Sequence, residues 1–173
     1  MPAASANIIE FSTTATDFAT ILLARSEKGV CAILLGDTAT ELCADLHKRW
    51  PLTQLVHNDT ALAPLLKTVT DFLVAPLTPL DFTLDIHGSD FQKSVWAVLR
   101  SIAVGDTLSY TDVAQLLHKP KAVRAVANAC AANPLALAIP CHRILRADGG
   151  ISGYRWGVER KRALLAQEQQ ARQ

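Results

Sequence analysis

The sequence lacks the segments that mark a membrane or secreted protein. Half of its 173 residues are hydrophobic, yet it has no long uncharged apolar run, so we expect no transmembrane helix. Residues 1–7 have neither the basic start nor the apolar stretch of a signal peptide. We therefore expect a cytoplasmic protein without membrane contact. A chain of this length can form one substantial core or two small ones.

Paired cysteines are also missing. The four cysteines are widely spread and none form a C-x-x-C pair; they are Cys31, Cys43, Cys130 and Cys141. In a cytoplasmic protein such spacing favours free thiols over disulfides. Cys43 and His47 can share a helix face, but no second pair at ligand spacing accompanies them. We expect neither a metal site nor another cofactor.

Acidic residues are scarce in the last third of the chain. Residues 119–173 hold 10 Lys and Arg against 3 Asp and Glu, whereas residues 1–118 hold 7 against 13. A basic third beside an acidic remainder indicates a localised contact with an anionic partner. A solvated basic helix face would explain the same counts.

Residues 1–80 predict a small α/β domain with a structural role. Apolar runs at 19–25 and 30–35 flank a turn that contains glycine, which is typical of a β-hairpin. Apolar residues at helical spacing predict helices over 39–50 and around 62–73. Two prolines then predict a linker, and we place the domain boundary at its end.

Residues 81–173 predict a mostly helical second domain. A short strand at 82–86 precedes the S-x-x-Q capping box of a helix. Ser109 can cap another short helix, and Pro120 suits the first position of a helix over 120–132. Two short helices joined by a tight turn form the helix-turn-helix pattern, which is found in DNA-binding proteins and also in structural helical hairpins.

The helix over 120–132 is dense in alanine, including Ala125 and Ala129, and so can approach a nucleic-acid groove closely. Arg124 and two neighbouring lysines add positive charge, whereas side chains that read base edges are scarce. We expect phosphate and shape contacts rather than sequence-specific readout. Close packing against the first domain is the competing explanation for the alanines.

The first candidate for chemistry is Cys141, which closes an apolar run and is followed by His142 and Arg143. Nearby positive charge lowers the pKa of a thiol and favours the nucleophilic thiolate. Neighbouring side chains diverge in extended backbone, so we expect a water between Cys141 and His142 rather than direct contact. Arg143 is either a DNA contact or a structural ion-pair partner, and we favour the structural role.

These motifs resemble the O6-alkylguanine-DNA alkyltransferases, and most closely the repair domain of the bacterial Ada-type members. The likeness covers roughly residues 86–168. It is carried by residues 109–110, 120–126, 132–134, 139–144 and 152–157. It implies a ribonuclease H-like first domain and a winged helix-turn-helix-like motif in the second. No counterpart of the zinc-binding domain of Ada-type members is present, so an activator role is not expected.

The resemblance implies catalytic and DNA-binding roles for individual residues. Cys141 would accept the alkyl group after deprotonation by His142. Glu168 would orient this histidine, and Asn133 would hydrogen-bond near the thiol. In the DNA complex, Arg124 would fill the gap left by the flipped nucleotide.

The resemblance also implies a substrate pocket around the thiol. Tyr110 would help to rotate the phosphate and contact the base. Tyr154, Ile144, Arg155 and Trp156 would line the pocket, and the bulk of Trp156 would disfavour large alkyl groups.

The implied function is DNA repair by direct, irreversible transfer of the alkyl group from O6-alkylguanine, and from O4-alkylthymine, in double-stranded DNA to Cys141. A thiolate suits displacement at an sp³ carbon, and the stacked base must be flipped out to be reached. The thioether product is not hydrolysable, so each molecule reacts once. We expect a monomer in the bacterial cytoplasm, at the nucleoid. A cysteine hydrolase or acyl transferase and a non-enzymatic DNA-binding regulator are the alternatives.

Overall fold

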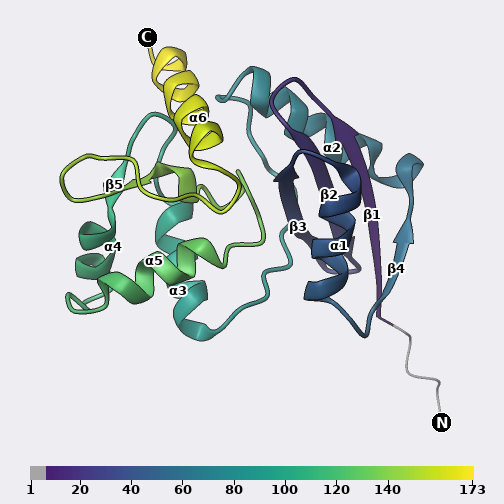
Figure 1. Ribbon diagram of the computed structural model, residues 1–173, viewed down its shortest axis with the longest axis horizontal. Coiled ribbons are helices and arrows are strands. Elements are labelled where there is room, and N and C mark those ends of the chain that lie inside the picture. Colours follow the sequence, from purple (N-terminus) through teal and green to yellow (C-terminus); the bar gives the residue numbers. More distant parts are fainter. Residues whose placement is uncertain (1–6) are drawn as a thin grey trace.

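The computed structural model describes residues 7–173. Residues 1–6, which hold most of the segment judged not to be a signal peptide, lie outside the described residues. Figure 1 shows a part built on a sheet beside a mainly helical part, with the C-terminal helix at one end of the helical part. Within residues 7–173, no helix combines the length and the apolar character needed to cross a membrane.

The elements alternate in the first part and become mainly helical in the second. The strands are β1 (Ile8–Ala15), β2 (Thr20–Ser26), β3 (Gly29–Gly36), β4 (Gln54–His57), β5 (Leu108–Ser109) and β6 (Ile144–Leu145). The helices are α1 (Ala39–Arg49), α2 (Asp59–Val74), α3 (Asp90–Arg100), α4 (Tyr110–Leu116), α5 (Val123–Ala131), the 3-10 turn η1 (Cys141–Arg143) and α6 (Val158–Ala171).

Four strands form one mixed sheet in the order β3-β2-β1-β4. β2 and β3 form the predicted antiparallel hairpin, and α1 and α2 confirm the two helices predicted in this half. β1 pairs antiparallel with β2 and parallel with β4. These two strands were not predicted, because β1 mixes apolar and polar residues with only two buried positions, and β4 is only four residues long.

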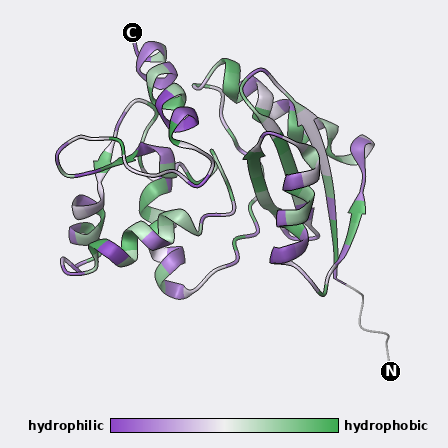
Figure 2. Ribbon diagram, viewed as in Figure 1, coloured by the Kyte–Doolittle hydropathy of each residue, from purple (hydrophilic) through white to green (hydrophobic). Residues whose placement is uncertain are grey.

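The sheet is covered on both faces. Ile21, Leu22, Leu23 and Ala24 of β2 are all fully buried, and successive strand residues point to opposite faces. α1 packs on β2 and β3, whereas α2 packs on β1 and β2. In Figure 1, α1 lies in front of the sheet and α2 behind it. Figure 2 shows the hydrophobic residues concentrated on β2 and β3, which form the centre of this core.

The outer edge of β3 binds two segments of the second part. Val30 exchanges backbone hydrogen bonds of 2.9 and 2.8 Å with residues 83–85, and Ile33 exchanges bonds of 2.9 and 3.0 Å with residues 134–136. The strand predicted over 82–86 is wrong in extent, because one bridge to Val30 is the only ladder it makes within residues 7–173. The two parts therefore share backbone bonds, and the boundary after residue 80 stays a prediction.

The helical part begins at two predicted capping boxes. Ser89 caps α3, and Ser109 with Asp112 caps α4. Trp96 on α3 donates its Nε1–H to the carbonyl of Ala129 on α5 at 2.9 Å. This bond is buried and ties α3 to α5, while α4 packs on both helices.

α4 and α5 form the predicted pair of short helices, but α5 begins later than predicted. It starts at Val123 rather than at Pro120. The N–H of Ala122 donates to the carbonyl of Lys119 at 2.9 Å, which closes a turn that contains Pro120. Pro120 therefore precedes the helix and does not occupy its first position.

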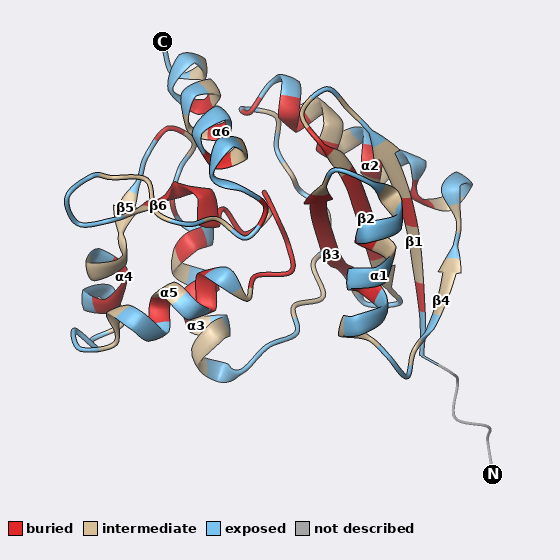
Figure 3. Ribbon diagram, viewed as in Figure 1, coloured by how far each residue is buried: buried red, intermediate tan, exposed pale blue. Residues whose placement is uncertain are grey.

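The segment after α5 is the most deeply buried part of the second half. Nearly every residue from 133 to 144 is buried, and Figure 3 shows this stretch in red between the helices and the sheet. It ends in η1, against which α6 packs. The sheet, α5 and α6 together fix the position of this segment.

Candidate active site

Cys141 is the first residue of η1 and is only 4% exposed. The backbone here is a 3-10 turn, so the expected extended conformation is wrong. Asn133, which is fully buried, donates its side-chain N–H to the Cys141 sulfur at 3.3 Å and to the Ile139 carbonyl at 2.8 Å. Its Oδ1 accepts the N–H of Leu135 at 2.8 Å. The chain beyond α5 thus holds an amide donor against the thiol.

The Cys141 thiol is neutral at rest. Burial raises its pKa to about 11, although the Asn133 hydrogen bond and the positive charges of Lys161 and Arg155 act to lower it. The predicted net lowering of this pKa is wrong, because complete burial outweighs the nearby cations. A thiol of this kind needs a base before it becomes a nucleophile.

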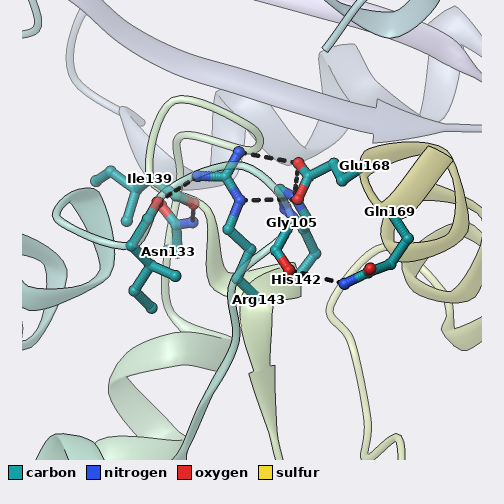
Figure 4. Close-up of polar contacts among 8 residues, drawn as sticks. Gly105, Asn133, Ile139, His142, Arg143, Glu168 and Gln169 are labelled. Carbon is teal, nitrogen blue, oxygen red and sulfur yellow. Dashed lines mark hydrogen bonds and ion pairs between the residues drawn. The ribbon is translucent and has the colours of Figure 1, made fainter. Parts of the chain in front are cut away.

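His142, Arg143 and Glu168 form a buried network between η1 and α6 (Figure 4). His142 Nε2 contacts Glu168 Oε1 at 2.7 Å. Arg143 donates from Nη2 to the same oxygen and from Nε to Oε2, both at 2.9 Å. Its Nη1 also donates to the carbonyl of Ile102 at 2.6 Å. The structural role favoured for Arg143 is confirmed.

The network fixes the protonation of His142. Burial alone would raise the pKa of Glu168, but hydrogen bonds from His142 and Arg143 outweigh it and bring the pKa to about 2. Burial lowers the pKa of His142 although Glu168 opposes this, so the imidazole is neutral at neutral pH.

A carboxylate only accepts hydrogen bonds, so the proton of neutral His142 is on Nε2. Nδ1 then carries the lone pair. This atom is buried and has no hydrogen-bond partner within residues 7–173. The residue that follows Cys141 therefore offers a proton acceptor that is free of other contacts.

Cys141 lies in the wall of a cavity of about 540 Å³ that is bounded by α5 and the loop before α6. Its lining residues are Tyr110, Ala127, Cys130, Ala131, Cys141, Arg146, Ser152, Gly153, Tyr154 and Arg155. Ile144 and Trp156, both predicted pocket residues, do not line it. Ile144 is buried where β6 pairs with β5. Trp156 is buried against Tyr154, and the centroids of the two rings are 5.4 Å apart. The size limit predicted from Trp156 therefore lacks a structural basis.

The chain is similar to known proteins in sequence and in structure. Residues 90–170 match the family model of the 6-O-methylguanine DNA methyltransferase DNA-binding domain. The inducible methylated-DNA–protein-cysteine methyltransferase of Bacillus subtilis is 39% identical over 131 residues, which are 76% of this chain and 73% of that protein. The chain belongs to the methylated-DNA–protein-cysteine methyltransferase family.

Further relatives are similar to this chain in sequence or in structure. The bifunctional transcriptional activator/DNA repair enzyme Ada of Escherichia coli is 50% identical over 147 residues, which are 85% of this chain and 42% of Ada. This chain spans less than half the length of the Ada relatives it matches. A crystal structure of Mycobacterium tuberculosis OGT in complex with DNA has a TM-score of 0.80 and 29% identity, and the match covers 95% of this chain and 94% of that one. The predicted mixed α/β fold is confirmed.

The residues predicted to bind DNA lie on α4 and α5 and differ in exposure. Arg124 and Ala125 are exposed on α5. Ala129 is only 2% exposed and faces α3, so its predicted place on the DNA-facing surface is wrong. Tyr110, at the start of α4, lines the cavity, and its hydroxyl lies 2.5 Å from that of Ser152.

Two buried residues near the thiol were missed in the sequence. Cys130 lines the same cavity as Cys141. Lys161 is fully buried, and its amine has no hydrogen-bond partner within the described part of the chain. Lys161 precedes Glu168 by seven residues, which places both on one face of α6. That spacing was the available signal, because a lysine on the buried face of a helix is unusual.

Proposed function

We propose that this protein repairs double-stranded DNA by irreversible transfer of an alkyl group from O6-alkylguanine, and from O4-alkylthymine, to Cys141. The observation that carries the proposal is a buried thiol in a cavity of about 540 Å³, next to a histidine whose free nitrogen is a base. A cavity of this size suits a purine base. The names of the family relatives support the same activity.

The Cys141 sulfur attacks the alkyl carbon, and the S–C bond forms as the C–O6 bond breaks. The bonding electron pair leaves with the guanine, which takes up one proton from water, and one proton leaves the thiol. That proton passes through a water to Nδ1 of His142, and the Glu168 carboxylate stabilises the resulting imidazolium. The Asn133 N–H stabilises the thiolate before attack.

The stacked base must leave the duplex to reach this thiol. Two short helices, α4 and α5, approach the DNA, and exposed Arg124 enters the gap that the flipped base leaves. Exposed Ala125 beside it allows close approach to the groove. Tyr154 lines the cavity, and its buried hydroxyl has no hydrogen-bond partner in residues 7–173, so we expect it to bond to the base once the base enters. We expect the chain to act as a monomer.

Intact-mass analysis after mixing with an O6-methylguanine duplex tests the proposal. We expect the mass of one methylene to be added at Cys141, in a single turnover, because the thioether is not hydrolysed. Cys141→Ala should remain unmodified. Cys130→Ala is the matched control, because it removes the other thiol of the same cavity, and it should still be methylated. Repeated turnover, or methylation elsewhere, would overturn the proposal.

A further inference from the structure

Two arginines line the cavity around Cys141, and they have different contacts. Arg146 lies near Asp148, with Nε 3.5 Å from the carboxylate, and both side chains are largely exposed. Arg155 instead reaches inward from an exposed position, and its Nη1 donates to the backbone carbonyl of Asn133 at 2.9 Å. Both arginines carry the same charge and line the same cavity. Arg155 contacts Asn133, the residue that donates to the Cys141 sulfur, whereas Arg146 contacts Asp148.

Asn133 is the residue that connects this contact to the thiol. Its side chain already makes three bonds, to the Cys141 sulfur, the Ile139 carbonyl and the Leu135 N–H. The bond from Arg155 engages the remaining polar group, its backbone carbonyl. A shift of that carbonyl turns the whole peptide, and with it the amide that donates to sulfur.

The loop that carries Arg155 forms one wall of the cavity. Residues 146–157 contain no helix or strand, and Ser152, Gly153 and Tyr154 line the cavity. Besides the bond from Arg155, a hydroxyl contact of 2.5 Å between Ser152 and Tyr110 attaches this loop to the helical part. Tyr110 and Ser152 both line the cavity, whereas the bond from Arg155 ends on the buried backbone of Asn133, which does not line it.

We propose that Arg155 is a positioning residue for alkyl transfer, which ties the 152–155 wall to Asn133 and so holds the Asn133 amide against the Cys141 sulfur. The inference rests on the proposed function and adds a residue to it. The charge of Arg155 also interacts with Asp45 and Arg49 of α1. Arg155 thus joins the loop before α6 to the buried segment that contains Asn133.

The test compares Arg155→Ala and Arg155→Lys with Arg146→Ala, which removes the same charge from the same cavity. Single-turnover methyl transfer is measured at saturating DNA, together with DNA affinity. We expect Arg155→Ala to lower the saturating rate constant by about tenfold or more, because a small misplacement of reacting groups is costly. DNA affinity should stay within about twofold. Arg155→Lys should not restore the rate, because lysine lacks the planar guanidinium that lies over the Trp156 ring, 5.3 Å from its centroid, and holds the donor in place. Arg146→Ala should lower the rate by less than Arg155→Ala does, because it leaves the bond to Asn133 in place.

A second measurement does not depend on DNA. The rate of Cys141 alkylation by iodoacetamide is followed by peptide mass analysis from about pH 8 to 11. It should shift to higher pH in Arg155→Lys as well as in Arg155→Ala, because the Asn133 bond to the thiolate is weakened even where the positive charge is kept. Arg146→Ala should shift less. If the parental protein fails to methylate while these profiles still separate, the proposed function fails and the Arg155 contact is supported.

Four results would overturn the inference. They are an unchanged rate in Arg155→Ala, a loss confined to DNA affinity, full rescue by lysine, and an equal loss in Arg146→Ala. The second result would make Arg155 a phosphate contact. Full rescue by lysine, or an equal loss in Arg146→Ala, would mean that the charge of Arg155, rather than its hydrogen bond, sustains the rate.

Discussion

Replacing Glu168 with glutamine tests the buried network most directly. Oε1 of Glu168 accepts bonds from His142 and from Arg143 Nη2, while Oε2 accepts from Arg143 Nε. A glutamine that keeps the first two contacts turns its NH₂ group toward Arg143 Nε. Two donors then face each other, and a buried guanidinium loses its counter-charge. No orientation of the amide satisfies all three donors.

The size of the effect follows from the pKa of Glu168. Its ordinary value of 4.5 falls to about 2 in the folded protein, and each unit corresponds to about 1.4 kcal/mol, so the network stabilises the ionised fold by about 3 kcal/mol. Breaking a buried ion pair by removing one partner costs a similar amount, about 3–5 kcal/mol. We therefore expect Glu168→Gln to lose about 3 kcal/mol in denaturant unfolding at neutral pH.

The pH dependence of this loss has a defined sign. Because the folded pKa is depressed, the Glu168 contribution is fully present above pH 4.5 and is lost as the pH falls toward about 2. The stability of the parental protein and that of Glu168→Gln should therefore converge in this acidic window.

Activity should fall with stability, for a separate reason. Without the carboxylate, nothing stabilises the imidazolium form of His142, and we expect single-turnover methyl transfer to slow by about 10²-fold or more. Glu159→Gln on the same helix is the control, because the Glu159 side chain is 88% exposed and, within residues 7–173, pairs only with Arg162. It should change neither the stability nor the rate. A Glu168→Gln protein with parental stability and rate would refute the reasoning.

Three further substitutions test the surroundings. Lys161→Met removes a buried amine that has no hydrogen-bond partner within residues 7–173. The free energy of unfolding should rise by about 1 kcal/mol or more, and methyl transfer should slow about tenfold because Cys141 loses a nearby positive charge. Higher stability without slower methyl transfer would contradict the expected effect of Lys161 on Cys141. Gly29 has φ +148°, and the Cβ added by Gly29→Ala would lie 2.7 Å from the Thr83 carbonyl oxygen. This variant should lose about 2 kcal/mol in free energy of unfolding and keep its methyl-transfer rate. Trp96→Phe leaves the buried Ala129 carbonyl of α5 without its donor and should lose about 1–3 kcal/mol in free energy of unfolding. Unchanged stability would mean that the bond from Trp96 to Ala129 contributes nothing.

Elements with strong local signals were predictable from the sequence. The capping boxes at Ser89 and Ser109 start α3 and α4 because each is closed by residues three apart. The β2–β3 hairpin has two apolar runs on either side of a short turn. In each case the deciding interactions join neighbours in the chain.

Elements that depend on partners elsewhere were missed or misplaced. β1 and β4 are recognisable only once they pair, since neither has a continuous apolar run. The start of α5 depends on a turn that the chain closes at Lys119. Ala129 was assigned to the DNA face from composition, whereas the helix orientation is set by its packing on α3.

The sequence by itself determined the candidates for the chemistry, because Cys141 and His142 are adjacent and their motif is local. Only the tertiary structure decided what surrounds them. Burial sets the thiol pKa against charges from α6 and the loop before it. Glu168, 26 residues from His142, fixes the imidazole proton. Burial and electrostatic interactions sum over neighbours in space, and the order of residues along the chain does not specify those neighbours.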